Sequence, residues 1–143
     1  MAYCTLAELT DRYGEGMLVA LTDRGETATG AIDADVVERA IADADAQIDG
    51  DLATRYALPL AEVPPLVRDI AMAPTAWNLH RAAPDPKVEA DWREAMRRLR
   101  QIAGGTIRLP SAAGVEAAGK AETGARITDR ERPPTGANPK GFV

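Results

Sequence analysis

Few residues in this chain could do covalent chemistry. It has one histidine, His80, and one cysteine, Cys4, and no spacing in the sequence assigns a Ser-His-Asp or Cys-His set to either. A single cysteine excludes an internal disulfide framework, and Cys4 has no evident neighbour that would activate its thiol. We therefore expect no catalytic residue, and a chain that is not an enzyme.

Acidic residues could in principle bind a hard cation through their oxygen atoms. Asp45 and Asp49 are four residues apart and share a helical face, but no Glu-x-x-His pair elsewhere would complete a site. Residues 23–33 superficially resemble an EF-hand loop, yet Ala34 stands where the bidentate glutamate is needed. A solvated acidic face is the usual meaning of this pattern, so we expect no metal and no cofactor.

Nucleic-acid or phosphate binding would need glycine-rich loops or clustered basic residues. Gly104 and Gly105 follow a predicted helix, whereas a phosphate loop must precede one. Arg93, Arg97 and Arg100 recur at helical spacing, but acidic residues alternate with them and the net charge is -5. This pattern favours a solvated or subunit-contacting face, and leaves a phosphate-backbone contact as the alternative.

The elements that must position these residues are helical. Only one Phe, two Trp and three Tyr occur, so Ala and Leu must fill much of the core, as in close-packed helices. The clearest buried stripe is Val37, Ile41, Ala44, Ile48 and Leu52. We predict an all-α fold, a small bundle of about four helices.

Capping and breaking residues set the expected helix limits. The spacing predicts a short strand at 106–109, and a kink or split in the third helix at Pro74 near Met72. A short apolar segment at 15–21 follows the first helix. The four helices are expected at residues 6–13, 34–56, from 64–65 through 80, and 87–103.

Composition divides the chain near residue 110. Residues 1–110 carry 12 basic and 18 acidic groups, whereas 111–143 carry 5 and 4 and lose helical periodicity. We predict a helical core over 1–110 and an extended C-terminal arm over 111–143, flexible when free and ordered by a partner. A solubilising linker is the alternative. Candidate anchors for such a partner within the arm are Val115, Ile127, Phe142 and Val143.

Several segments of the core, taken in order, carry a family resemblance. The chain opens with Met1-Ala2-Tyr3-Cys4-Thr5-Leu6-Ala7-Glu8-Leu9, and it later contains Tyr56-Ala57-Leu58-Pro59-Leu60 and Val63-Pro64-Pro65-Leu66. Together they resemble the small structural proteins of Mu-like phages and prophages. The helical layout is similar to that of the head–tail connectors of long-tailed phages, which the resemblance implies form twelve-fold rings on the portal.

The resemblance implies a head–tail connector (adaptor) subunit that forms a homo-oligomeric ring beneath the portal and links the DNA-filled capsid to the tail. The portal would lie above the ring, and a stopper or tail-terminator protein below it. Genomic DNA would pass through without sequence-specific binding, since acidic faces repel phosphates. We expect assembly in the host cytoplasm, a place at the head–tail junction of the virion, and no membrane association. The alternatives are another neck or tail-completion protein, or a helical DNA-binding or packaging accessory protein.

Overall fold

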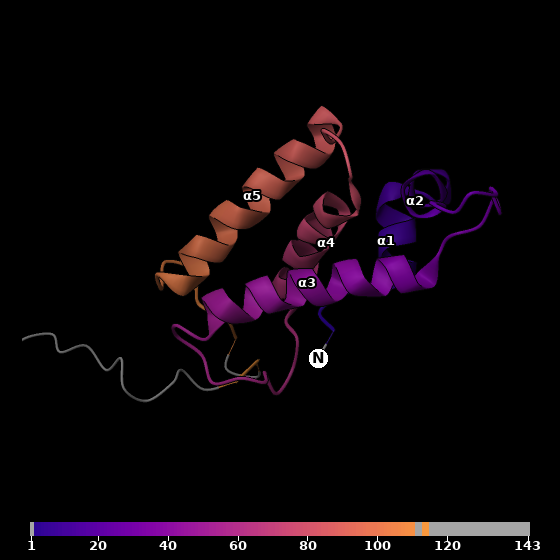
Figure 1. The fold of residues 1–143 in the computed structure, drawn as a ribbon. Helices are drawn as coiled ribbons and strands as arrows, with labels where there is room; N and C mark the ends of the chain where they lie inside the picture. Colours follow the sequence, from indigo (N-terminus) through magenta and orange to yellow (C-terminus); the bar gives the residue numbers. More distant parts are fainter. Residues whose placement is uncertain (1, 111–112, 115–143) are drawn as a thin grey trace, which may run out of the picture.

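The computed structural model describes residues 2–110 and 113–114, and within these ranges the secondary structure is helical, without β-strands (Figure 1). This confirms the all-α prediction. The apolar segment after the first helix is itself helical, so the described residues form five helices instead of about four. They are α1 (Leu6–Tyr13), α2 (Glu15–Thr22), α3 (Ala34–Leu52), α4 (Pro65–Leu79) and α5 (Pro86–Ala103).

Helices α1 and α2 form a tight pair because a capping box starts the first and a glycine ends it. The Thr5 side chain accepts a hydrogen bond from the Glu8 amide, and Glu8 accepts one from the Thr5 amide. Gly14 has a φ of 88°, a left-handed conformation that favours glycine, and α2 begins at the next residue. Leu9 and Leu18 are the buried residues that fix this pair to the rest of the protein.

Helix α3 carries the predicted buried stripe, and Asp33 caps it by accepting the Asp35 amide at 3.0 Å. It ends at Leu52, so the predicted end at Tyr56 is wrong. The amides of Arg55 and Tyr56 both bond to the Leu52 carbonyl, which closes a turn after the helix. Tyr56 is buried instead in the segment that connects α3 to α4.

Helix α4 runs without a break through Pro74, so the predicted split near Met72 is wrong. Proline lacks an amide hydrogen and removes one bond from the helical ladder. Pro74 and its neighbours Ala73 and Thr75 are buried, and tertiary packing holds the helix together around the missing bond. The Thr75 hydroxyl donates to the Ala71 carbonyl at 2.8 Å on the same turn.

Helix α5 begins as the sequence predicts, with Asp85 as its cap and Pro86 in its first turn. It ends before Gly105, whose φ is 84°. Residues 106–109 do not form the predicted strand, because their amides find other acceptors. The Ile107 amide bonds back to the Gln101 carbonyl, and the Leu109 amide donates to the Tyr56 hydroxyl at 2.9 Å.

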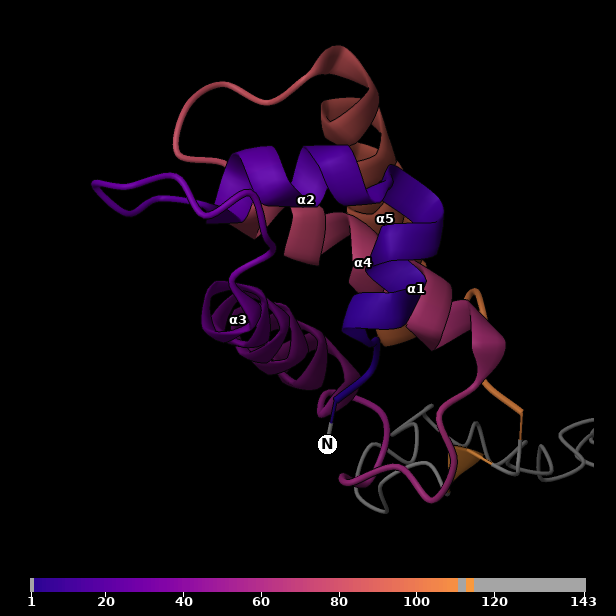
Figure 2. The ribbon, with the colours of Figure 1, turned by 90° about the vertical axis from the view of Figure 1, so that its right-hand side faces the viewer.

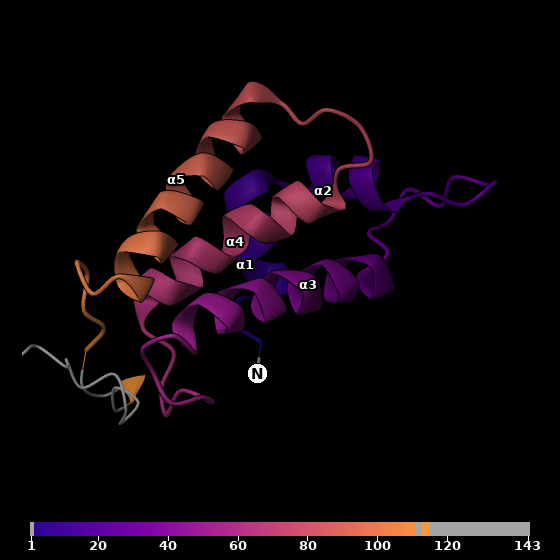
Figure 3. The same ribbon diagram turned by 60° about the vertical axis from the view of Figure 1, so that its left-hand side comes forward.

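The helices form two groups. Helices α3, α4 and α5 pack on one another, with α4 between the other two, whereas α1 packs on both α3 and α4 and α2 packs on α3 (Figures 1, 2 and 3). At the α4–α5 contact the rings of Trp77 and Trp92 stack with centroids 4.4 Å apart. The loop over residues 23–33 extends away from this body in each view.

Replacing Ile48 with Asp should destabilise the protein more than the substitution of any exposed residue on the same helix. Ile48 has no exposed surface, so the charge would enter the α3 seam without a partner. We expect a loss of about 3–5 kcal/mol in the free energy of unfolding, measured by urea titration with circular dichroism. Ala46→Asp, two residues away and exposed, is the control and should cost less than about 1 kcal/mol. Equal stability of the two variants would refute the buried-stripe assignment.

Candidate functional site

His80 and Cys4 both serve the fold in this structure. His80 follows the last residue of α4, where its Nδ1 lies 2.7 Å from the Ala76 carbonyl. Cys4 is buried with its Sγ 3.6 Å from the Thr75 hydroxyl, and burial raises the pKa of the thiol to about 11. A thiol with a raised pKa is a poor nucleophile at neutral pH. The two side chains do not contact each other: Cys4 contacts Thr75, whereas His80 contacts Ala76.

The acidic face of α3 differs from its predicted role as a uniformly solvated surface. Asp45 is only 9% exposed and accepts a hydrogen bond from the Tyr3 amide at 3.2 Å. Asp49 accepts a hydrogen bond from the Tyr3 hydroxyl. Burial raises the pKa of Asp45, and burial together with Asp49 raises the pKa of the Tyr3 phenol. The two carboxylates therefore hold the N-terminal segment against α3.

The loop over residues 23–33 is closed by one of its own carboxylates. Asp23 accepts hydrogen bonds from the amides of Thr29, at 2.9 Å, and Gly30, at 3.0 Å. These backbone bonds lower the pKa of Asp23. No group of three or more potential metal ligands occurs among the residues that the structure describes.

The arginines of α5 are largely engaged by acids on the same helix. Arg93 pairs with Glu89, and Arg97 pairs with Glu94 through two nitrogen atoms. The hydrogen bonds from Arg97 lower the pKa of Glu94 to about 2. Arg100 is exposed and makes no ion pair within the described residues. Only Arg100, of the three arginines with helical spacing, is thus without an acidic partner in the described part of the chain.

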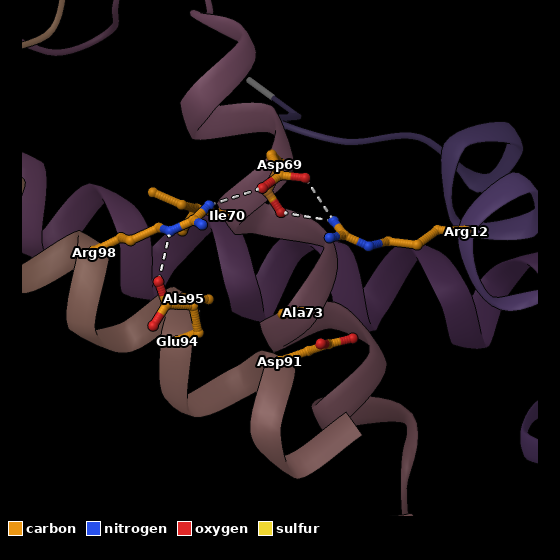
Figure 4. A pocket seen from close by; sticks show the side chains of 8 residues that line it. All are labelled: Arg12, Asp69, Ile70, Ala73, Asp91, Glu94, Ala95 and Arg98. Carbon is orange, nitrogen blue, oxygen red and sulfur yellow. Dashed lines mark hydrogen bonds and ion pairs between the residues drawn. The ribbon is translucent and has the colours of Figure 1, made fainter. Parts of the chain in front are cut away.

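A pocket of about 160 Å³ lies where α1, α4 and α5 meet, and Asp69 is its central charge (Figure 4). Asp69 on α4 accepts from Arg12 of α1 at 2.8 Å and from Arg98 of α5 at 3.2 Å. Arg98 also donates to Glu94 at 2.9 Å. These charges therefore pair with one another within the pocket. The Arg12–Asp69–Arg98 ion pairs, here called the brace, link α1, α4 and α5.

Sequence reasoning missed this brace, and it missed the role of Tyr3. Asp69 is separated by 57 residues from Arg12 and by 29 from Arg98, so no local spacing connects them. The predicted anchors Val115, Ile127, Phe142 and Val143 lie outside the described residues.

The path of the chain toward the C-terminal arm is described as far as Gly114. Ala113 is buried, and its carbonyl accepts the Ala61 amide at 2.9 Å. Leu109 is also buried, and its amide bonds to Tyr56. These contacts place the start of the arm against the segment between α3 and α4.

The described residues form a small helical protein. Its polar side chains mainly link the helices to one another or form charged surfaces. The chain belongs to the family described as bacteriophage Mu, Gp36, whose model matches residues 3–128. It is 39% identical over 105 residues to gene product J of Escherichia phage Mu, which covers 73% of this chain and 74% of that protein. The chain is therefore a Mu-like phage protein. In the described part, no helix is long and apolar enough to cross a membrane.

Replacing Asp45 with Asn should stabilise the protein at neutral pH. A raised folded-state pKa means that the fold favours the protonated carboxyl, so its contribution to stability is lost as pH rises through that pKa. Asn removes the charge and keeps an oxygen that can accept the Tyr3 amide. We expect a higher Tm than the parent at pH 7, with a difference that shrinks toward pH 3.

Asp43→Asn is the matched control, since Asp43 is exposed on the same helix and makes no ion pair among the described residues. Its Tm should follow the parent at both pH values. A destabilised Asp45→Asn variant at pH 7 would show that the charge itself, and not the oxygen, holds Tyr3.

Proposed function

We propose that this chain is a head–tail connector (adaptor) subunit that forms a ring beneath the portal and joins the DNA-filled head to the tail. The observation that carries the proposal is the match to the Mu Gp36 family over residues 3–128, which covers the whole helical core. A structural role also agrees with the use of polar groups to link the parts of the fold. Asp45, Asp69 and Glu94 are all engaged in contacts between or within helices.

A ring subunit needs a body that keeps its shape while neighbours bind to its surface. The Arg12–Asp69–Arg98 brace links the N-terminal pair of helices to α4 and α5, and the stacked Trp77 and Trp92 lie on the α4–α5 contact. Each exposed ion pair contributes little alone, whereas a network anchored on three helices restricts their relative movement. This rigidity supports a structural role, and we propose that the chain is not an enzyme.

A connector must also let the genome pass without binding it. The net charge of -5 means that the chain as a whole does not attract phosphate groups. The arginines of α5 are mostly paired with acids, which weakens the alternative of a DNA-binding accessory protein. The helical fold favours an adaptor over the β-rich folds expected of other neck proteins.

The direct test is to delete the gene from its phage and examine the particles that form. We expect DNA-filled heads and separate tails in electron micrographs, with attachment restored when the protein is supplied from a plasmid. Cryo-electron microscopy of wild-type virions should then show helical density of this chain between the portal and the tail. Normal tailed particles from the deletion, or density elsewhere in the virion, would overturn the proposal.

Truncation after Gly114 should separate folding from attachment. This cut keeps the buried Ala113 and its bond to the Ala61 amide, so the described core should remain folded. If the arm with its anchors Val115, Ile127, Phe142 and Val143 binds the portal or a neighbouring subunit, incorporation into particles should fall sharply. Far-ultraviolet circular dichroism checks the fold, and counts of tailed particles check attachment. Wild-type counts would make the arm a passive linker.

A further inference from the structure

One end of the molecule carries an excess of unpaired acidic groups. This acidic end is residues 23–43, which contain six acids and two bases. Asp23 and Asp33 are engaged by backbone amides. The other four acids are exposed and make no ion pair within the described residues: Glu26, Asp35, Glu38 and Asp43.

A second surface carries the opposite charge. This basic end is residues 97–110, which contain four arginines and no acid. Arg97 and Arg98 are bound to Glu94. Arg100 and Arg108 are exposed and have no acidic partner in the part of the chain that the structure describes.

The two surfaces lie at opposite ends of the body. Helix α3 begins beside the protruding loop over 23–33, and its other end lies next to the end of α5 (Figures 1 and 3). The acidic end thus includes an element that extends away from the subunit, where it can reach a neighbour. The basic end comprises the last turns of α5 and the residues after them, on the side of the body away from the loop over 23–33.

Helix α5 differs from α3, because its acids are paired with bases on the same helix. Unpaired acids are therefore not a requirement for forming a helix in this fold. Every acid in the middle of α5 has a basic partner three or four residues away: Glu89, Asp91 and Glu94. On α3, Asp35 and Glu38 are three residues apart with like charge, an arrangement that disfavours a helix. Arg39 is four residues from both Asp35 and Asp43, but no ion pair links it to either, so these acids remain available to an opposite charge from outside the subunit.

The outward face of α3 is also smooth enough for close approach. Ala42, Ala46 and Gly50 follow one another at intervals of four on its exposed side. A Cβ added at Gly50 would have no atom within 4 Å, so no packing within the described part of the subunit requires glycine there. Of these three residues, Ala42 lies within the acidic end beside Asp43, whereas Ala46 and Gly50 lie beyond it toward the other end of α3.

We propose that the acidic end of one copy binds the basic end of the next copy. The proposal rests on the proposed function, because it names the contact between neighbouring subunits of the ring. Two different complementary surfaces give a head-to-tail contact, which closes into a ring when the rotation allows it. A two-fold contact through either end would instead place like charges together.

Reversing charge at each end tests this contact on the full-length chain. The acid variant is Glu38→Lys with Asp43→Lys, and the base variant is Arg100→Glu with Arg108→Glu; none of these residues has an ion pair among the described residues. The matched control is Asp11→Lys with Glu15→Lys, two exposed acids outside both ends. Sedimentation velocity over a range of ionic strengths measures assembly.

The parent and the control should assemble, and their assembly should weaken as salt rises. Each reversal variant alone should sediment as a monomer, because the two substitutions bring the net charge of the acidic end from -4 to 0, or that of the basic end from +4 to 0, and so remove the attraction. An equimolar mixture of the two variants should assemble again, because all contacts between alternating copies become complementary. A single chain carrying all four reversals should also assemble.

Three results would overturn the proposal. These are reversal variants that assemble like the parent, a mixture that stays monomeric although circular dichroism shows both variants folded, and a parent that is monomeric at every concentration and salt. A failure of this proposed contact can be distinguished from a failure of the proposed function. Location of the chain at the neck by microscopy can stand when the charge-swap result fails, and the charge swap can succeed for a ring found elsewhere in the virion.

Discussion

Helix α3 buries Val37, Ile41, Ala44, Ile48 and Leu52 in the core, and the other elements are placed relative to this seam. The stripe packs against α4 and α5, while α1 contacts both α3 and α4 and α2 contacts α3. The N-terminal segment then reaches back to the same helix through Tyr3. One helix therefore supplies the apolar contact that drives folding and the carboxylates that hold the first residues in place.

Much of this fold follows from local signals in the sequence. The starts of the helices were predicted from contacts between neighbouring residues. These are the capping box at Thr5, the caps at Asp33 and Asp85, and the apolar period of α3. Where tertiary packing competes with a local rule, the prediction was wrong. Pro74 remains inside α4 because its surroundings are buried, and residues 106–109 bond to Gln101 and Tyr56 instead of forming a strand.

The polar contacts were harder to predict for a related reason. A carboxylate on α3 looks the same in the sequence whether it faces water or a buried amide, so Asp45 could not be told apart from Asp43. Which one is buried depends on where Tyr3 lies, and that contact spans 42 residues. The brace at Asp69 likewise depends on the crossing of three helices. Long-range pairs of this kind have no spacing signal, whereas pairs along α5 do.

The distribution of charge separates what holds the subunit together from what its surface offers to others. Ion pairs along α5 and around Asp69 are satisfied within the chain, so they stabilise the fold without requiring a neighbour. The acids of α3 that face outward make no ion pair within the described residues, so they remain available to an opposite charge that approaches from outside. A subunit built in this way folds before it assembles, because its core does not depend on the surfaces that remain uncompensated.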